Sequence, residues 1–192
     1  MKKLFFSLSA LFFGIMMAQA QLVIKPAVGV NFTDLSKDQP DGEFKSKVGW
    51  QIGGSIVFGE KKFYLEPGIF YLQKSSKFET SDASVEDIDF DISGIRIPIT
   101  IGLSLGDETS TVKMRVFGGG SAFILTSVKD LDKDDFKDAS WGLYAGAGID
   151  FSMFFLEGSY EWSLTNISDD VSQIDVGKSR SVFIQAGIRI KL

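Results

Sequence analysis

From Gly94 to Leu105 the sequence alternates strictly between apolar and polar residues. Isoleucine or leucine occupies every second position, and glycine, arginine, proline, threonine or serine fills the positions between. A period of two predicts a β-strand whose two faces meet different surroundings. Seven further segments of the 192-residue chain alternate in the same way, and they begin near Leu22, Val48, Phe63, Val112, Trp141, Phe154 and Val182. Together these segments predict eight strands.

The connections between these segments alternate in length. Long polar connections at residues 33–47, 74–87, 127–139 and 166–180 are separated by short ones near 59–62, 106–110 and 152. Short turns at one end and long loops at the other, with an even number of strands, are typical of a barrel in an outer membrane. The predicted fold is therefore all-β: an eight-stranded antiparallel up-and-down transmembrane β-barrel over residues 21–192.

One segment changes phase within itself. Ile88, Phe90 and Ile92 alternate in the opposite register to the isoleucines that follow Gly94. One extra residue in a strand shifts the side chains beyond it to the other face. We therefore expect a β-bulge near Ser93 and Gly94.

Residues 1–20 differ in character from the rest of the chain. Lys2 and Lys3 precede an apolar run from Leu4 to Met17, and Ala18-Gln19-Ala20 follows it. A basic start, a short apolar run and a small-x-small site predict a secretory signal peptide, cleaved here before Gln21. The run is too short to cross a membrane as a helix, which needs roughly 20 residues. Cleavage would remove two lysines and change the formal charge from −5 to −7.

The two faces of the strands distinguish a membrane barrel from a soluble one. A lipocalin-like ligand binder, the soluble alternative, would place its apolar face inward. Here one face is almost purely aliphatic and aromatic, and the other carries glycine, serine and both signs of charge, which favours lipid outside. The lumen of such a barrel is narrow, and unpaired charges there cost several kcal/mol, so we expect a paired network. Its predicted members are Lys25, Glu66, Arg96, Arg115, Glu157, Glu161 and Arg189.

Aromatic residues mark the ends of the predicted outer face. Trp50, Tyr71, Trp141 and Trp162 lie on the apolar faces close to strand ends. Membrane barrels carry girdles of such residues at the lipid–water interfaces. These four residues are therefore predicted to form an aromatic girdle. The alternative is packing inside the core of a β-sandwich.

The composition excludes much familiar chemistry. The chain has no cysteine and no histidine, so it lacks a thiolate, an imidazole base and a Ser-His-Asp triad. A carboxylate pair at Glu157 and Glu161 leaves a small barrel enzyme as an alternative, and a narrow channel is another. The metal candidates Asp130, Asp132 and Asp134 are weak, because the glycine and distal glutamate of a calcium loop are missing. We expect no cofactor, and the acidic balance argues against nucleic acid.

Two resemblances add to this interpretation. The chain end resembles the signal by which barrels are passed to the outer-membrane assembly machinery, and its matching residues are Gln185, Gly187, Ile190 and Leu192. The segments at 29–32, 63–71, 95–99, 142–148 and 157–167 are similar to the PorT-like outer-membrane β-barrel family of Gram-negative bacteria. That resemblance implies an outer-membrane location, contact with its lipid and the assembly machinery, and a candidate link to protein secretion. It supplies no catalytic residues.

The expected function is therefore non-enzymatic. Four long acidic loops would face the exterior, where exposed loops commonly carry recognition. Their partner would be an unidentified extracellular molecule or a component of a secretion apparatus.

Overall fold

The computed structural model describes residues 22–35, 42–46, 48–59, 62–80, 88–106, 110–128, 139–165 and 179–192. The predicted signal peptide at residues 1–20 lies outside these ranges. The strands are β1 (Leu22–Leu35), β2 (Gly42–Ser46), β3 (Val48–Phe58), β4 (Phe63–Thr80), β5 (Ile88–Leu105), β6 (Val112–Val128), β7 (Ala139–Phe151), β8 (Phe154–Ser163), β9 (Ser179–Ile188) and β10 (Ile190–Lys191). Within the described ranges, no helix is long and apolar enough to cross a membrane.

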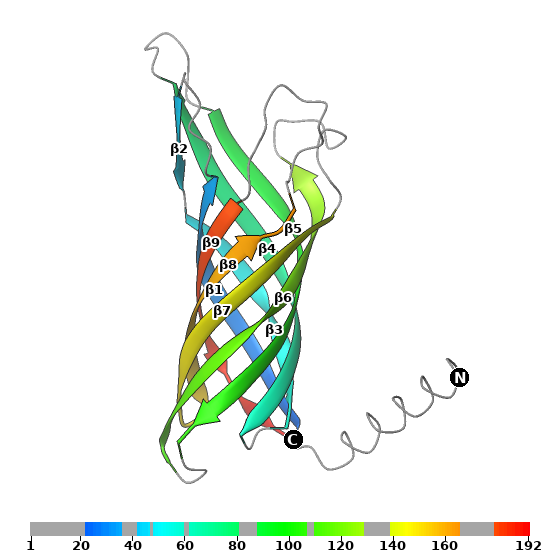
Figure 1. Ribbon diagram of the computed structural model, residues 1–192, viewed down its shortest axis with the longest axis vertical. Coiled ribbons are helices and arrows are strands. Elements are labelled where there is room, and N and C mark those ends of the chain that lie inside the picture. Colours follow the sequence, from blue (N-terminus) through cyan, green and yellow to red (C-terminus); the bar gives the residue numbers. More distant parts are fainter. Residues whose placement is uncertain are drawn as a thin grey trace, which may run out of the picture.

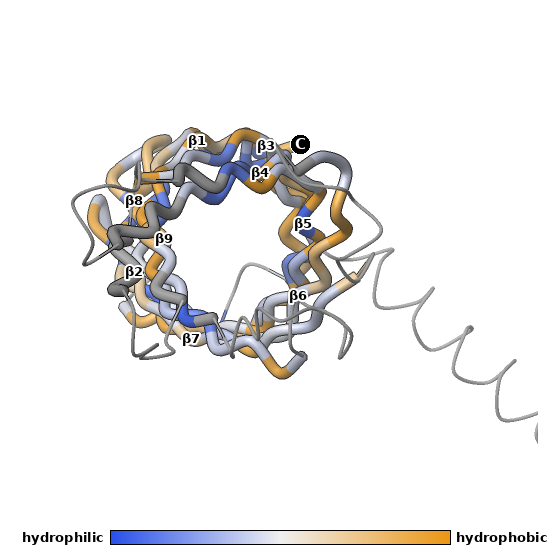
Figure 2. The backbone as a smooth tube through the Cα atoms, turned by 90° about the horizontal axis from the view of Figure 1, so that it is seen from above, coloured by the Kyte–Doolittle hydropathy of each residue, from blue (hydrophilic) through white to orange (hydrophobic). Residues whose placement is uncertain are grey.

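The strands close into a single antiparallel barrel, as the sequence predicted (Figure 2). Each long strand pairs with its neighbour in the chain, and β1 pairs with β9 to close the ring, with Val30 opposite Ile184. Two short strands lengthen existing walls of the barrel. β10 continues β9 along β1, and β2 pairs with the upper part of β4. The ten strand segments therefore form an eight-stranded barrel.

The two ends of the barrel differ (Figure 1). At one end, here called the turn end, three short connections join β3 to β4, β5 to β6 and β7 to β8. Gly59 and Gly106 have φ values of 83° and 114°, and Ser152 has 55°, so all three turns use the left-handed region. The first and last strands also meet here, where the Leu192 amide donates to the Leu22 carbonyl at 3.0 Å. The opposite end is called the loop end.

Several strands run further toward the loop end than the sequence pattern indicated. The connection expected from Lys74 onward begins only after Thr80, and β2 occupies part of the one expected at 33–47. The expectation is wrong because polar composition does not distinguish a loop from a strand that continues beyond the apolar segment. In the structure they remain extended through backbone pairing of β4 with both β2 and β5.

The predicted bulge is confirmed, and at this point the apolar side chains of β5 change from one face of the strand to the other. The register between β5 and β6 shifts at Ser93 and Gly94. Below the shift, Ile97 and Ile99 are exposed on the outer wall. Above it, Ile92 packs inward against a buried apolar cluster formed by Leu72, Phe123, Leu125 and Phe183. A buried apolar cluster therefore lies inside the barrel near its loop end, next to buried polar residues such as Thr33 and Lys74.

Candidate functional site in the barrel lumen

Two basic residues, Lys25 and Arg115, occupy the centre of the lumen near the turn end. Lys25 on β1 is fully buried, and its Nζ lies 2.7 Å from both Glu66 Oε1 on β4 and Glu157 Oε1 on β8. The guanidinium of Arg115 on β6 reaches the same Glu157 oxygen at 2.6 Å and lies 3.7 Å from Glu66 Oε2. These contacts cross the lumen between strands that are not neighbours. A charged layer therefore fills the cross-section at this height.

The layer includes a carboxylate that sequence reasoning did not place in the network. Asp150 at the end of β7 accepts hydrogen bonds from Arg115 Nε at 3.0 Å and Nη2 at 2.7 Å, and it also pairs with Arg189. Its inward position in the alternation was the available signal. With Asp150 included, three carboxylates face Lys25, Arg115 and Arg189, so the layer is balanced.

Neutral side chains add hydrogen bonds to this layer. Ser55 Oγ donates to Glu66 Oε1 at 2.6 Å, and Gln185 Nε2 donates to Glu157 Oε2 at 2.5 Å. Gln185, which was predicted as part of the C-terminal assembly signal, has its side chain inside the lumen. Burying a carboxylate is tolerated when its oxygens are paired in this way.

A second charged layer lies closer to the loop end. Arg96 on β5 donates to Glu161 Oε2 from Nε at 3.0 Å and Nη2 at 2.7 Å, and Ser121 donates to the same oxygen at 2.8 Å. The Arg96 guanidinium also lies 4.5 Å from the Phe183 ring centre. Lys74, which the sequence pattern assigned to a loop, is buried with its Nζ 5.2 Å from the Phe123 ring centre.

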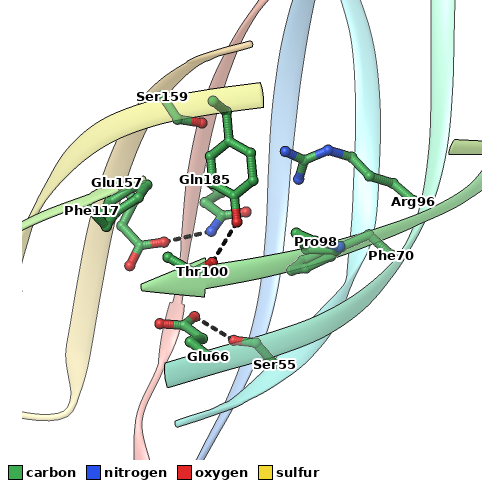
Figure 3. A pocket seen from close by; sticks show the side chains of 11 residues that line it. Ser55, Glu66, Phe70, Arg96, Pro98, Thr100, Phe117, Glu157, Ser159 and Gln185 are labelled. Atoms are coloured by element: carbon green, nitrogen blue, oxygen red, sulfur yellow. Dashed lines mark hydrogen bonds between the residues drawn. The ribbon is translucent and has the colours of Figure 1, made fainter. Parts of the chain in front are cut away.

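Between the two layers lies a small polar cavity (Figure 3). Its volume of about 30 Å³ is enough for about two water molecules. Thr100 and Tyr144 share a hydrogen bond of 2.5 Å at its wall, and Glu66 and Glu157 border it from below. All seven residues predicted for the lumen network are buried inside the barrel, and in two layers rather than one.

Inward-facing glycines accommodate the large side chains of the lumen. Tyr64 lies against Gly102, its partner across the β4–β5 ladder, and Glu157 lies against Gly148, where an added Cβ would stand 2.7 Å from Glu157 Cγ. Gly53, Gly146 and Gly187 similarly face aromatic rings inside the barrel. The lumen is therefore filled by side chains over most of its length.

The outer wall is apolar, and its aromatic residues gather at both ends. Trp50 and Tyr71 are exposed near the loop end with ring centres 5.5 Å apart, and Trp50 Nε1 donates to Gln73 Oε1 at 2.9 Å. Trp141 and Trp162 are also exposed there. At the turn end the exposed rings are phenylalanines, which sequence reasoning missed although the apolar alternation contained them: Phe63, Phe151 and Phe154.

Tryptophan fluorescence tests the depth of the aromatic residues. All three tryptophans lie near the loop end, so their quenching by brominated lipids should be strongest when the bromines are close to the headgroups. The control is Ile99→Trp, which adds an indole at an exposed position midway along β5 and should move the quenching maximum toward the bilayer centre. Maximal quenching of the unmodified protein at the bilayer centre would contradict the assignment.

The other predicted site residues belong to the C-terminal assembly signal and to the candidate metal site. Ile190 and Leu192 are exposed at the turn end, and Gly187 faces the Phe155 ring inside the barrel. Asp130, Asp132 and Asp134 lie outside the described residues. In the described part of the chain, no group of three or more acidic side chains is arranged to hold a metal ion.

A closed eight-stranded barrel with an apolar outer wall and a lumen of paired charges is an integral membrane β-barrel. The chain belongs to the family described as outer membrane protein beta-barrel domain, whose model matches residues 17–169. Its location is therefore the outer membrane. No curated protein matches the sequence.

Two solved structures are similar to this fold. The outer membrane protein OprG from Pseudomonas aeruginosa is 14% identical, with a TM-score of 0.54, and the match covers 88% of this chain and 94% of OprG. Neisserial surface protein A is 17% identical, with a TM-score of 0.53, and the match covers 89% of this chain and 97% of that protein. At these identities the likeness concerns the barrel fold alone.

Proposed function

We propose that this protein is a non-enzymatic outer-membrane barrel that presents its four long loops to an extracellular or secretion partner. The observation that carries the proposal is the filled lumen, where two layers of paired charges occupy the cross-section at different heights. Because the charged side chains of these layers are paired with one another, they are poorly placed to act on a substrate or to line a transport path. The loops and the exposed rims of the barrel are then the parts available for recognition.

The composition of the connections supports a recognition role. Residues 36–41, 81–87, 129–138 and 166–178 join strands at the loop end, and together they contain thirteen acidic residues and five lysines. Barrels of outer membranes place their longer connections outside the cell. A surface of this composition favours a partner with a basic face.

The filled lumen predicts that the protein does not conduct ions. In planar bilayers, the purified full chain should give no discrete current steps, because the Lys25–Glu157–Arg115 and Arg96–Glu161 contacts leave room only for isolated water between them. A porin inserted under the same conditions serves as the positive control. Reproducible single-channel steps from folded protein would favour the channel alternative instead.

The recognition role is tested by replacing one loop while keeping the barrel. Residues 129–138 are exchanged for a glycine–serine segment of equal length, and surface crosslinking on intact cells is compared with the unmodified protein. We expect the barrel to retain its heat-modifiable gel migration and to lose its crosslinked partner. The matched control reverses the order of residues 129–138, which preserves composition and charge but not sequence. Unchanged crosslinking after each of the four loops has been exchanged in turn would argue against the proposal.

The proposal includes export by a cleaved signal peptide. Terminal sequencing of the protein from outer membranes should begin at Gln21 if residues 1–20 are a cleaved signal peptide.

The proposal also includes a role in protein secretion. A PorT-like role in secretion predicts that deleting the gene changes the set of proteins released to the medium. An unchanged set would restrict the function to other surface interactions.

A further inference from the structure

The small polar cavity between the two charged layers, here called the central cavity, borders a carboxylate oxygen that the protein leaves without a hydrogen bond. Glu66 lines the cavity and is more than nine-tenths buried. Its Oε1 accepts hydrogen bonds from Lys25 and Ser55. Its Oε2 has no hydrogen bond within the described part of the chain, and Arg115 Nη1 lies 3.7 Å from it. A buried carboxylate oxygen needs a hydrogen-bond donor, so Glu66 has capacity for a further partner.

The wall of the central cavity also carries donors with spare capacity. Arg96 lines it, and its Nε and Nη2 donate to Glu161, whereas its Nη1 has no hydrogen bond to any residue that the structure describes. Ser159 on β8 lines it as well, and among the same residues its hydroxyl is also without a hydrogen bond. Figure 3 shows Arg96 and Ser159 on the upper side of the cavity and Glu66 on the lower side. Unused donors therefore lie above an unused acceptor.

The charges around the central cavity favour a neutral occupant. A cation beside Glu66 would lie close to the Arg96 guanidinium, and an anion beside Arg96 would face the carboxylates of Glu66 and Glu157. Part of the wall would repel either ion, and the low dielectric of the interior strengthens that repulsion. Water is neutral and both donates and accepts hydrogen bonds, and the volume of about 30 Å³ is enough for about two molecules.

We propose that the central cavity is a binding site for about two ordered water molecules that connect the two charged layers. One water accepts a hydrogen bond from Arg96 Nη1, and the other donates to Glu66 Oε2, with the Ser159 hydroxyl as a further partner. Waters that bridge buried polar groups are nearly as favourable as direct hydrogen bonds. The upper layer of Arg96 and Glu161 and the lower layer around Lys25 and Arg115 are then joined through water.

The waters are detected by magnetisation transfer from water to arginine side chains, measured by nuclear magnetic resonance. The sample is the folded full chain with isotope-labelled arginine in lipid nanodiscs. We expect transfer to the Arg96 guanidinium from water that stays bound much longer than water at the protein surface. Arg115 is the internal control, because it is buried in the same lumen but does not line the central cavity, and it should show no such transfer.

Two serine variants test the wall of the central cavity. Ser159→Ala should shorten the residence time of the bound water about fivefold, the effect expected when one hydrogen bond is lost. The matched control is Ser104→Ala, because Ser104 is a partly buried serine on β5 that does not line the cavity. It should leave the residence time unchanged. The heat-modifiable gel migration of each variant shows whether it has folded.

Three results would overturn the water site: transfer to Arg96 no greater than transfer to Arg115, an unchanged residence time in folded Ser159→Ala, or an equal effect of Ser104→Ala. An ion as the occupant would also contradict it, and Arg96 signals that move when rubidium bromide replaces sodium chloride at equal ionic strength would reveal one. If Ser159→Ala does not fold, the comparison of Arg96 with Arg115 in the unmodified protein still decides.

Discussion

Replacing Arg115 by methionine should destabilise the barrel by about 3–5 kcal/mol, the usual cost of leaving buried charges without their partner. Its side chain is 1% exposed and contacts carboxylates on β7 and β8, with a third on β4 at 3.7 Å. After the change, Glu66, Asp150 and Glu157 would share only Lys25 and Arg189. The measurement is urea unfolding in lipid vesicles, followed by tryptophan fluorescence and by the gel migration of unheated samples.

Two further variants separate charge balance from simple loss of packing. Glu157→Gln in the Arg115→Met background restores equal numbers of acidic and basic groups, so the double variant should recover part of the lost stability. Lys62→Met removes an exposed lysine near the same end of the barrel, and surface changes of this kind usually fall within about 0.5 kcal/mol. Equal stability of Arg115→Met and Lys62→Met would show that the network does not hold the barrel together.

Strand alternation is what made this network predictable. In a membrane barrel of eight strands, a charged side chain on the polar face points into the narrow lumen, where it must be paired. The number of strands, the inward faces and the bulge at Ser93 and Gly94 followed from the same rule. None of them depended on knowing which strands lie opposite each other.

The pairings themselves depend on register and tilt, which alternation does not specify. Lys25 meets Glu157 across 132 residues of sequence, and Arg96 meets Glu161 across 65. The alternation alone could not separate seven charges into two layers with a cavity between them. Lys74 was missed for another reason. The apolar alternation of β4 stops before the strand ends, and the polar residues that follow resemble a loop in composition.

Replacing Gly102 by alanine should cost about 1–3 kcal/mol, because it adds a methyl group to a well-packed interior. A Cβ at this position would overlap the ring of Tyr64, its direct partner on β4. The ring has little space to move, since Tyr64 packs against Val23 and Val57 and lies 5.8 Å from the Arg115 guanidinium. The loss is measured by the same urea unfolding.

Gly158 provides a matched control for Gly102 on the opposite face of the wall. It is exposed on β8, and an added Cβ there would have no atom within 4 Å. Gly158→Ala should therefore be neutral or stabilise the barrel by up to about 1 kcal/mol, because glycine inside a strand loses more conformational entropy than alanine. In a Tyr64→Leu background, Gly102→Ala should cost less than in the unmodified protein, since neighbouring changes are not additive. Two results would contradict this explanation: equal changes in unfolding free energy for Gly102→Ala and Gly158→Ala, or a loss for Gly102→Ala that is the same with Tyr64 and with Tyr64→Leu. Either would show that packing of the Tyr64 ring does not require glycine at position 102.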